Sequence, residues 1–309
     1  MQLWNDLTVH PWGYLIGVSC YLTLLLNIKR IKKHVQYQGS IATKSNCTTF
    51  LPTAKVVVDC ILLSSPLAVL HLILGWRLMS TSEGNAFVHS IAMGLLVSAR
   101  YFFPLEMIRQ ISRTGGLAEN HFQWPSRSTQ LLRKSLRWFI DLAIPAVTVV
   151  GIISQFGETR WENSLGRLTY SVLMSLCFIY LLVLLHPSKG VFSDFLSRNA
   201  DGWIDRLKYI WYSSFAIGPL ALMGMSLMGY QYTAIRLTML LHTTFITLVG
   251  LLLLSSLIHR WLLLRRREIV VSQARHRLEE ARRRDPGTPL RTTQTLSHAP
   301  PIQDRILHR

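Results

Sequence analysis

The chain has 309 residues, of which 50% are hydrophobic and only 16% are charged, and its mean hydropathy is +0.27. This composition excludes an ordinary water-soluble domain, because the apolar residues gather in runs that are too long for one soluble core. The formal net charge of +17 does not indicate nucleic-acid binding, since the Lys and Arg residues lie between the apolar runs and not along one amphipathic face. We therefore expect an all-α, polytopic membrane helix bundle.

Seven apolar runs are long enough to be membrane spans, because a helix needs about 20 apolar residues to cross about 30 Å of hydrocarbon. The predicted spans are residues 11–28, 56–76, 86–103, 138–154, 168–185, 209–228 and 237–258. After the last span, residues 259–284 combine Arg, Leu, Ala and Glu at helical density and predict a basic juxtamembrane helix. Residues 285–309 are rich in Pro, Thr, Ser and His, which predicts a disordered tail.

The charges between the spans predict the orientation of the bundle in the membrane. Residues 29–55 carry six Lys and Arg and no acid, and residues 100–137 carry seven basic and two acidic groups. In contrast, the basic and acidic groups cancel in residues 77–85 and in residues 155–167. Because cytoplasmic loops hold the excess of Lys and Arg, the N-terminus is expected outside and the C-terminus inside the membrane.

Two carboxylates lie within the apolar runs, where a charge is costly and suggests a functional role. Asp59 and Asp141 follow Lys55 and Arg137 by four residues on the same helix faces. We expect each pair to form an interfacial ion pair, which is a structural role.

The sequence contains no pattern that indicates an enzyme. Ser226 and His242 could pair as in an intramembrane protease, but a small residue in a membrane helix more often serves helix packing. We expect His71 and His242 to be neutral groups that hydrogen-bond between helices. The four cysteines form no CxxC pair and have no histidines at metal-ligand spacing, so no metal or cofactor is expected.

Two sets of residues are candidates for membrane function. Basic side chains at the cytoplasmic ends of the first and last spans could bind anionic lipid, each contributing about 1 kcal/mol near the surface. They are Lys29, Arg30, Lys32, Lys33, Arg260, Arg265, Arg266 and Arg267. Pro145, Gly218 and Pro219 lie inside spans and are possible hinges, because proline removes a backbone donor.

Several stretches, in this order and spacing, resemble a known family. They are residues 116–125 (GLAENHFQWP), 164–168 (SLGRL), 185–190 (LHPSKG), 198–203 (RNADGW) and 260–267 (RWLLLRRR). The set is similar to the large mechanosensitive channels of the small-conductance superfamily, of the MscK/KefA or MscM type. The resemblance covers roughly residues 1–284.

The resemblance implies a membrane bundle that precedes the pore in a bacterial inner-membrane channel. In that family the bundle would surround a homo-heptameric pore, contact the lipid bilayer and respond to bilayer tension during osmotic stress. The pore helix and cytoplasmic domain of the family have no counterpart here, so we expect a truncated fragment that does not conduct alone. Two alternatives stay open: a stand-alone polytopic transporter, and a lipid-binding membrane module.

Overall fold

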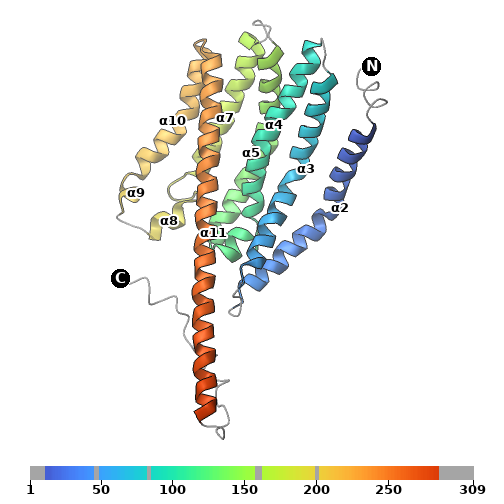
Figure 1. Ribbon diagram of the computed structural model, residues 1–309. Coiled ribbons are helices and arrows are strands. Elements are labelled where there is room, and N and C mark those ends of the chain that lie inside the picture. The colour runs from blue at the N-terminus through green and yellow to red at the C-terminus, as the bar shows by residue number, and fades with distance from the viewer. Residues whose placement is uncertain (1–10, 45–48, 82–84, 157–161, 199–201, 285–309) are drawn as a thin grey trace. The chain divides into compact units, whose positions relative to one another are not determined.

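The computed structural model describes residues 11–44, 49–81, 85–156, 162–198 and 202–284. All regular secondary structure in these ranges is helical, which confirms the predicted all-α polytopic bundle (Figure 1). The long helices are α2 (Pro11–Ala42), α3 (Leu51–Thr81), α4 (Ala86–Ile111), α5 (Ser126–Phe156), α7 (Arg167–Leu184), α10 (Lys208–Leu227) and α11 (Gln231–Arg284). Short elements join them: the π-helices η1 (Leu117–His121) and η2 (Glu162–Gly166), and the helices α8 (Ser193–Arg198) and α9 (Trp203–Arg206).

Six of the described helices are long and apolar enough to cross a membrane, and they correspond to the second through seventh predicted spans. Helix α2, which contains the first predicted span at residues 11–28, is not among these six. The count of seven spans and its orientation therefore stay predictions. The predicted disordered tail, residues 285–309, lies outside the described residues.

The helices extend beyond the predicted spans at the basic ends. Helix α2 continues from the predicted boundary at Ile28 to Ala42, and α5 begins at Ser126, twelve residues before its predicted span. Hydropathy defines only the apolar part of a helix, whereas the backbone ladder continues wherever polar residues can also pack. Helix α11 joins the seventh predicted span and the predicted juxtamembrane helix in one uninterrupted element.

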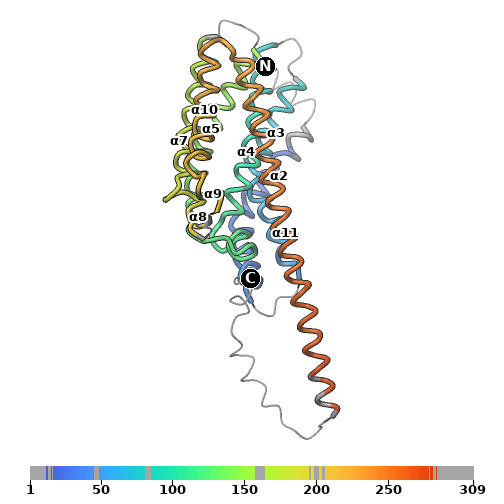
Figure 2. Tube along the Cα trace, turned by 90° about the vertical axis from the view of Figure 1, so that its left-hand side faces the viewer, coloured from blue at the N-terminus to red at the C-terminus, as the bar shows by residue number. Residues whose placement is uncertain are grey.

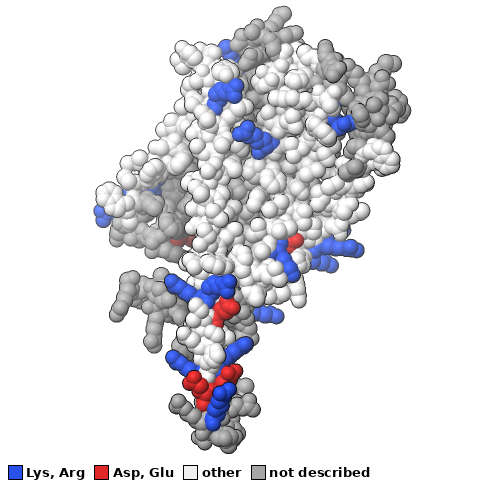
Figure 3. Space-filling view, in the orientation of Figure 1, with Lys and Arg blue, Asp and Glu red and all other residues white. Residues whose placement is uncertain are grey.

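The chain divides into two compact units, residues 1–261 and residues 262–309. In the first unit, successive long helices pack side by side in the order α2, α3, α4, α5, α7 and α10, and α4 has its most extensive contacts with α3 and α5 (Figures 1 and 2). In the second unit, the described part is the end of α11, which carries exposed Arg interspersed with Glu (Figure 3). The surface of the first unit carries few charges in the same view.

Glycines allow the closest helix approaches in the first unit. A Cβ added at Gly94 of α4 would lie 2.8 Å from the Thr148 carbonyl oxygen of α5, and one added at Gly75 of α3 would lie 3.0 Å from the Ala92 carbonyl oxygen. Small residues bring backbones close where lipid provides no hydrophobic force between helices. Beyond the α4–α5 crossing, aromatic and aliphatic side chains fill the core, including the stacked Phe139 and Tyr180 rings, whose centroids are 4.2 Å apart.

Candidate functional site

A polar packed region of the bundle lies where the second half of α2, the first half of α3, the end of α4, η1 and the start of α5 meet. Its apolar base is a second core that includes Val35, Val56, Cys60, Ile111 and Ala118. The sequence 116–125, one of the stretches that carries the family resemblance, forms the turn between α4 and α5 here. We refer to this region as the basic end.

The turn is held by its own polar groups. The Glu119 carboxylate accepts a hydrogen bond from the Gly115 backbone nitrogen at 2.7 Å and another from the Thr129 hydroxyl at 2.8 Å. Gly115 has a φ of +69°, a conformation that favours glycine. A Cβ at Gly39 of α2 would lie 2.6 Å from the Asn120 amide nitrogen and closer still to the Gly115 carbonyl oxygen. Glycine at position 39 therefore lets α2 pack directly on the turn.

His121 is buried at the end of η1 and contacts α3. Its Nδ1 lies 2.9 Å from the Thr53 hydroxyl oxygen, and the residue is 1% exposed. Burial, and secondarily the nearby Arg260 guanidinium, lower the pKa of His121 from 6.5 to about 4. His121 is therefore neutral at physiological pH and acts as a packed polar residue.

The carboxylate of Asp59 has a different partner from the one predicted. Its Oδ2 lies 2.6 Å from His34 Nδ1, and His34 Nε2 lies 3.0 Å from the Gln38 amide nitrogen. The expected pair with Lys55 is wrong, because α2 places an imidazole over the inward face of α3. The expected Asp141 pair is also wrong: Asp141 is exposed on α5 and has no ion-pair partner among the described residues.

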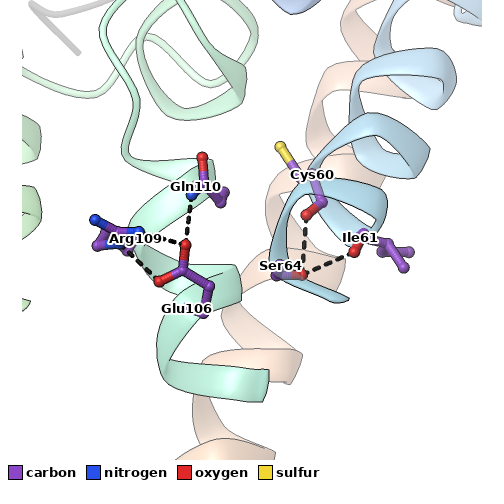
Figure 4. A network of polar contacts seen from close by, with 6 residues as sticks. All are labelled: Cys60, Ile61, Ser64, Glu106, Arg109 and Gln110. Atoms are coloured by element: carbon purple, nitrogen blue, oxygen red, sulfur yellow. Dashed lines mark hydrogen bonds and ion pairs between the residues drawn. The ribbon is translucent and has the colours of Figure 1, made fainter. Parts of the chain in front are cut away.

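A buried carboxylate lies near the end of α4. Glu106 is 4% exposed, and its two oxygens accept hydrogen bonds from Arg109 Nε at 2.7 Å and Arg109 Nη2 at 2.6 Å. The Gln110 amide donates to Glu106 Oε1 at 2.5 Å. Figure 4 shows these three side chains on α4 opposite Ser64 of α3, whose hydroxyl donates to the carbonyl oxygens of Cys60 and Ile61.

Further cations from two neighbouring helices and from the turn are within electrostatic reach of this carboxylate. Burial lowers the pKa of Lys32 on α2, and the nearby Arg113, Arg109 and Arg133 lower it further. Burial likewise lowers the pKa of Arg113, followed by the effects of Arg133 and Arg109. The four cations are therefore near enough to influence one another electrostatically, and Glu106 acts on Lys32, Arg113 and Arg133 in the opposite direction.

The predicted lipid-binding residues fall into two groups. Lys29, Arg30, Lys33 and Arg265 to Arg267 are exposed, and Lys32 is half-buried among the cations described above. Arg265 also pairs with Glu268 at 3.0 Å. Arg260 is 4% exposed, and its Nη2 donates to the Ala42 carbonyl oxygen at 2.9 Å, which caps the end of α2.

Sequence reasoning missed Glu106, Arg113, Arg133 and His121 as site residues, since it counted them only as loop charges or not at all.

The structure also shows the contacts of the membrane histidines, of Ser226 and of the possible hinge residues. His71 Nδ1 lies 3.0 Å from the Ser98 hydroxyl of α4, as expected of an interhelical hydrogen bond. His242 instead packs against Tyr101, with ring centroids 4.1 Å apart and ring planes tilted by 31°. The Ser226 hydroxyl donates to Gln231 Oε1 and not to His242, so no serine–histidine pair forms. The possible hinge residues Pro145, Gly218 and Pro219 lie inside continuous α5 and α10, and hinge motion stays a prediction. Among the described residues, no cluster of His, Cys, Asp or Glu could hold a metal ion.

These features define a class of protein: a helical membrane domain with a dense basic end. Its described residues include no arrangement typical of an enzyme active site. The chain belongs to the family described as mechanosensitive ion channel inner membrane domain 1, whose model matches residues 11–302. It is 25% identical over 285 residues to the miniconductance mechanosensitive channel MscM of Escherichia coli (strain K12). That match covers 91% of this chain and 25% of the relative, so the chain spans about a quarter of the relative's length. No solved structure matches the chain significantly.

Proposed function

We propose that these residues form the tension-responsive peripheral membrane domain of a mechanosensitive channel that protects bacteria against osmotic stress. In this proposal the domain lies in the inner membrane with its C-terminus inside, surrounds the pore of a homo-heptamer, and does not conduct by itself. The family membership and the apolar helices support a role in the bilayer, and the apolar side chains that fill the core of the first unit suit a sensor better than a conduit.

The observation that carries the proposal is the loose attachment of α11. Large apolar side chains along its membrane segment are exposed, including Leu240, Leu248 and Leu251. Bilayer tension favours whichever conformation occupies the larger area in the membrane plane, as a ligand favours the state that it binds better. A helix whose apolar surface faces away from the packed core can change position without breaking that core.

The polar contacts of α11 with the other helices are few and specific. The Tyr170 hydroxyl of α7 donates to the Ala234 carbonyl oxygen at 3.1 Å and lies 2.7 Å from the Thr238 hydroxyl. Near the basic end, Arg260 caps α2 as described above. Between these two contacts, Arg100 Nη2 of α4 donates to the Thr243 hydroxyl at 3.3 Å, and His242 lies against Tyr101. With so few polar contacts to exchange, α11 could shift against the core as a rigid helix.

The exposed basic residues of α2 and α11 would hold the domain at the inner headgroup layer. Lys29, Arg30 and Lys33 extend from one helix, and Arg265 to Arg267 extend from the other. Each cation near an anionic leaflet contributes on the order of 1 kcal/mol. This attraction fixes the depth of the helix ends while tension acts on the apolar segments.

The test is a distance measurement between spin labels on the full chain in lipid nanodiscs. The four natural cysteines are first replaced, and labels are placed on exposed positions of α11 and α3, Leu251 and Leu72. Withdrawal of lipid by cyclodextrin, which mimics tension, should change their distance distribution. A control pair on Phe87 of α4 and Val149 of α5, across the tight crossing, should not respond.

An unchanged α11–α3 distance would refute the tension response. Patch-clamp recording from channel-deficient spheroplasts that express the chain tests the second part of the proposal. Silence under suction is the expected result, whereas tension-gated currents would show that the chain conducts by itself.

A further inference from the structure

The basic end holds more positive charge than its carboxylates balance. Lys32, Arg109, Arg113 and Arg133 come from α2, α4, the turn and α5. Ile31 and Val35, on either side of Lys32, pack in one apolar cluster with Ile111, two residues before Arg113. Glu106 is already engaged by Arg109 and Gln110. Thr129, one helical turn before Arg133, donates to Glu119 of the turn, so that this second carboxylate is also engaged. Within the described residues, Lys32, Arg113 and Arg133 form no ion pair or side-chain hydrogen bond.

Burial makes this excess costly. Arg113 Nη1 is fully buried and has no hydrogen-bond acceptor in the described part of the chain. The side chains of Lys32, Arg113 and Arg133 are half-buried, so water screens their repulsion only in part. Like charges held together in a partly buried site are stabilised when an anion with several oxygens binds between them.

The residue types select the anion. A guanidinium presents a planar fork of donors that matches two oxygens of a phosphate, and a lysine adds a compact point charge. A single carboxylate would offer only two oxygens to at least three free cations. A phosphate group offers more oxygens and more negative charge in the same volume.

We infer that Lys32, Arg113 and Arg133 form a binding site for a phosphate group, with Arg109 held in place beside it by Glu106. Two sources share this chemistry, the headgroup of an anionic phospholipid and free inorganic phosphate. The location at the basic ends of membrane helices favours the lipid, because basic pockets between such helices accept lipid headgroups. The inference rests on the proposed membrane function and adds a specific binding site for the lipid headgroup. The site itself requires neither tension sensing nor a second chain.

The chain provides a matched pair of variants. Lys32→Gln with Arg133→Gln removes two charges from the site. Lys33→Gln with Lys134→Gln removes two charges from the adjacent positions of the same helices, which are exposed. General attraction between a basic protein and an anion falls equally in both double variants, so only a defined site separates them.

The experiment measures the thermal unfolding midpoint of the full detergent-solubilised chain against inorganic phosphate, dihexanoyl phosphatidic acid and dihexanoyl phosphatidylcholine. Phosphatidic acid should raise the midpoint of the wild-type protein and of the Lys33/Lys134 variant in a saturable manner. In the Lys32/Arg133 variant its affinity should fall by roughly tenfold or more, since each lost charge-assisted hydrogen bond has about that effect. Arg113→Gln should give a similar loss.

The controls separate the sources and guard against misfolding. Stabilisation by phosphatidic acid but not by inorganic phosphate identifies the lipid headgroup, and equal stabilisation by both identifies a free phosphate site. Without ligand, the Lys32/Arg133 variant should unfold at the wild-type midpoint or above, because it relieves repulsion. The inference is overturned if neither phosphate compound stabilises the wild type, if phosphatidylcholine acts equally well, or if the two double variants respond alike.

Discussion

The crossing of α4 and α5 makes a quantitative prediction about Gly94. A Cβ at this position would lie 2.8 Å from the Thr148 carbonyl oxygen and 3.1 Å from the Ile152 backbone nitrogen, and would also collide with the Ile152 side chain. The Ile152 side chain can rotate, but the two backbone atoms cannot. Optimal heavy-atom contacts are about 3.5–4.0 Å, so Gly94→Ala should force the helices apart by roughly 0.5–1 Å.

Such overpacking costs about 1–3 kcal/mol in a well-packed core. Gly94→Ala should therefore destabilise the chain by that amount, measured as a lower midpoint in SDS-induced unfolding followed by tryptophan fluorescence. Gly151→Ala should cost less, since its added Cβ would lie 3.1 Å from the Gly94 Cα, with its next contacts at 3.4 Å or beyond. Gly224→Ala on α10 is the matched control, because a Cβ there meets nothing within 4 Å. If Gly94→Ala and Gly224→Ala gave equal midpoints, the close crossing would not exist.

Three further predictions concern polar contacts of the first unit. Because folding lowers the pKa of His121 from 6.5 to about 4, its contribution to stability is complete above pH 6.5 and is lost as the pH falls toward 4. The loss should reach up to about 3 kcal/mol, and His121→Asn should flatten this part of the pH–stability curve; an unchanged curve would contradict a buried neutral imidazole. Tyr170→Phe removes the hydrogen bonds to α11 and should cost about 1 kcal/mol in SDS unfolding, whereas Tyr230→Phe, at an exposed ring, should have no effect. Asp59→Asn should cost about 1–3 kcal/mol by weakening the contact with His34, and a Lys55→Gln variant with an equal cost would point back to the pair predicted from sequence.

The spans followed from the sequence because membrane helices are defined by a local property. About 20 apolar residues must occur together in the chain, so their positions can be read without knowledge of neighbours. The second through seventh predicted spans match described helices, except that the spans 168–185 and 209–228 each end one residue beyond the helix. The ends of the helices were harder to predict from the sequence. Residues 29–42 of α2 are polar by composition, yet they remain helical through packing of Val35, Gln38 and Gly39.

Sequence reasoning also identified the family, because five short stretches keep their order and spacing over most of the chain. It did not predict what those stretches do in the fold. Residues 116–125 form a tight turn whose Glu119 bonds to its own backbone, and residues 185–190 form a turn in which His186 Nδ1 accepts hydrogen bonds from two backbone nitrogens. A motif gives the residue types, while the hydrogen-bond partners depend on the closed geometry of the loop.

The sequence by itself determined that this is a membrane protein, that it is helical, and that positive charge is in excess at one set of helix ends. Only the tertiary structure decided that His34 and not Lys55 approaches Asp59, and that Lys32, Arg113 and Arg133, from three different segments, come within electrostatic reach of Glu106. The reason is physical. Hydropathy and net charge are sums over neighbouring residues in the chain, whereas an ion pair or an anion site depends on which helices become neighbours and how each is rotated about its axis.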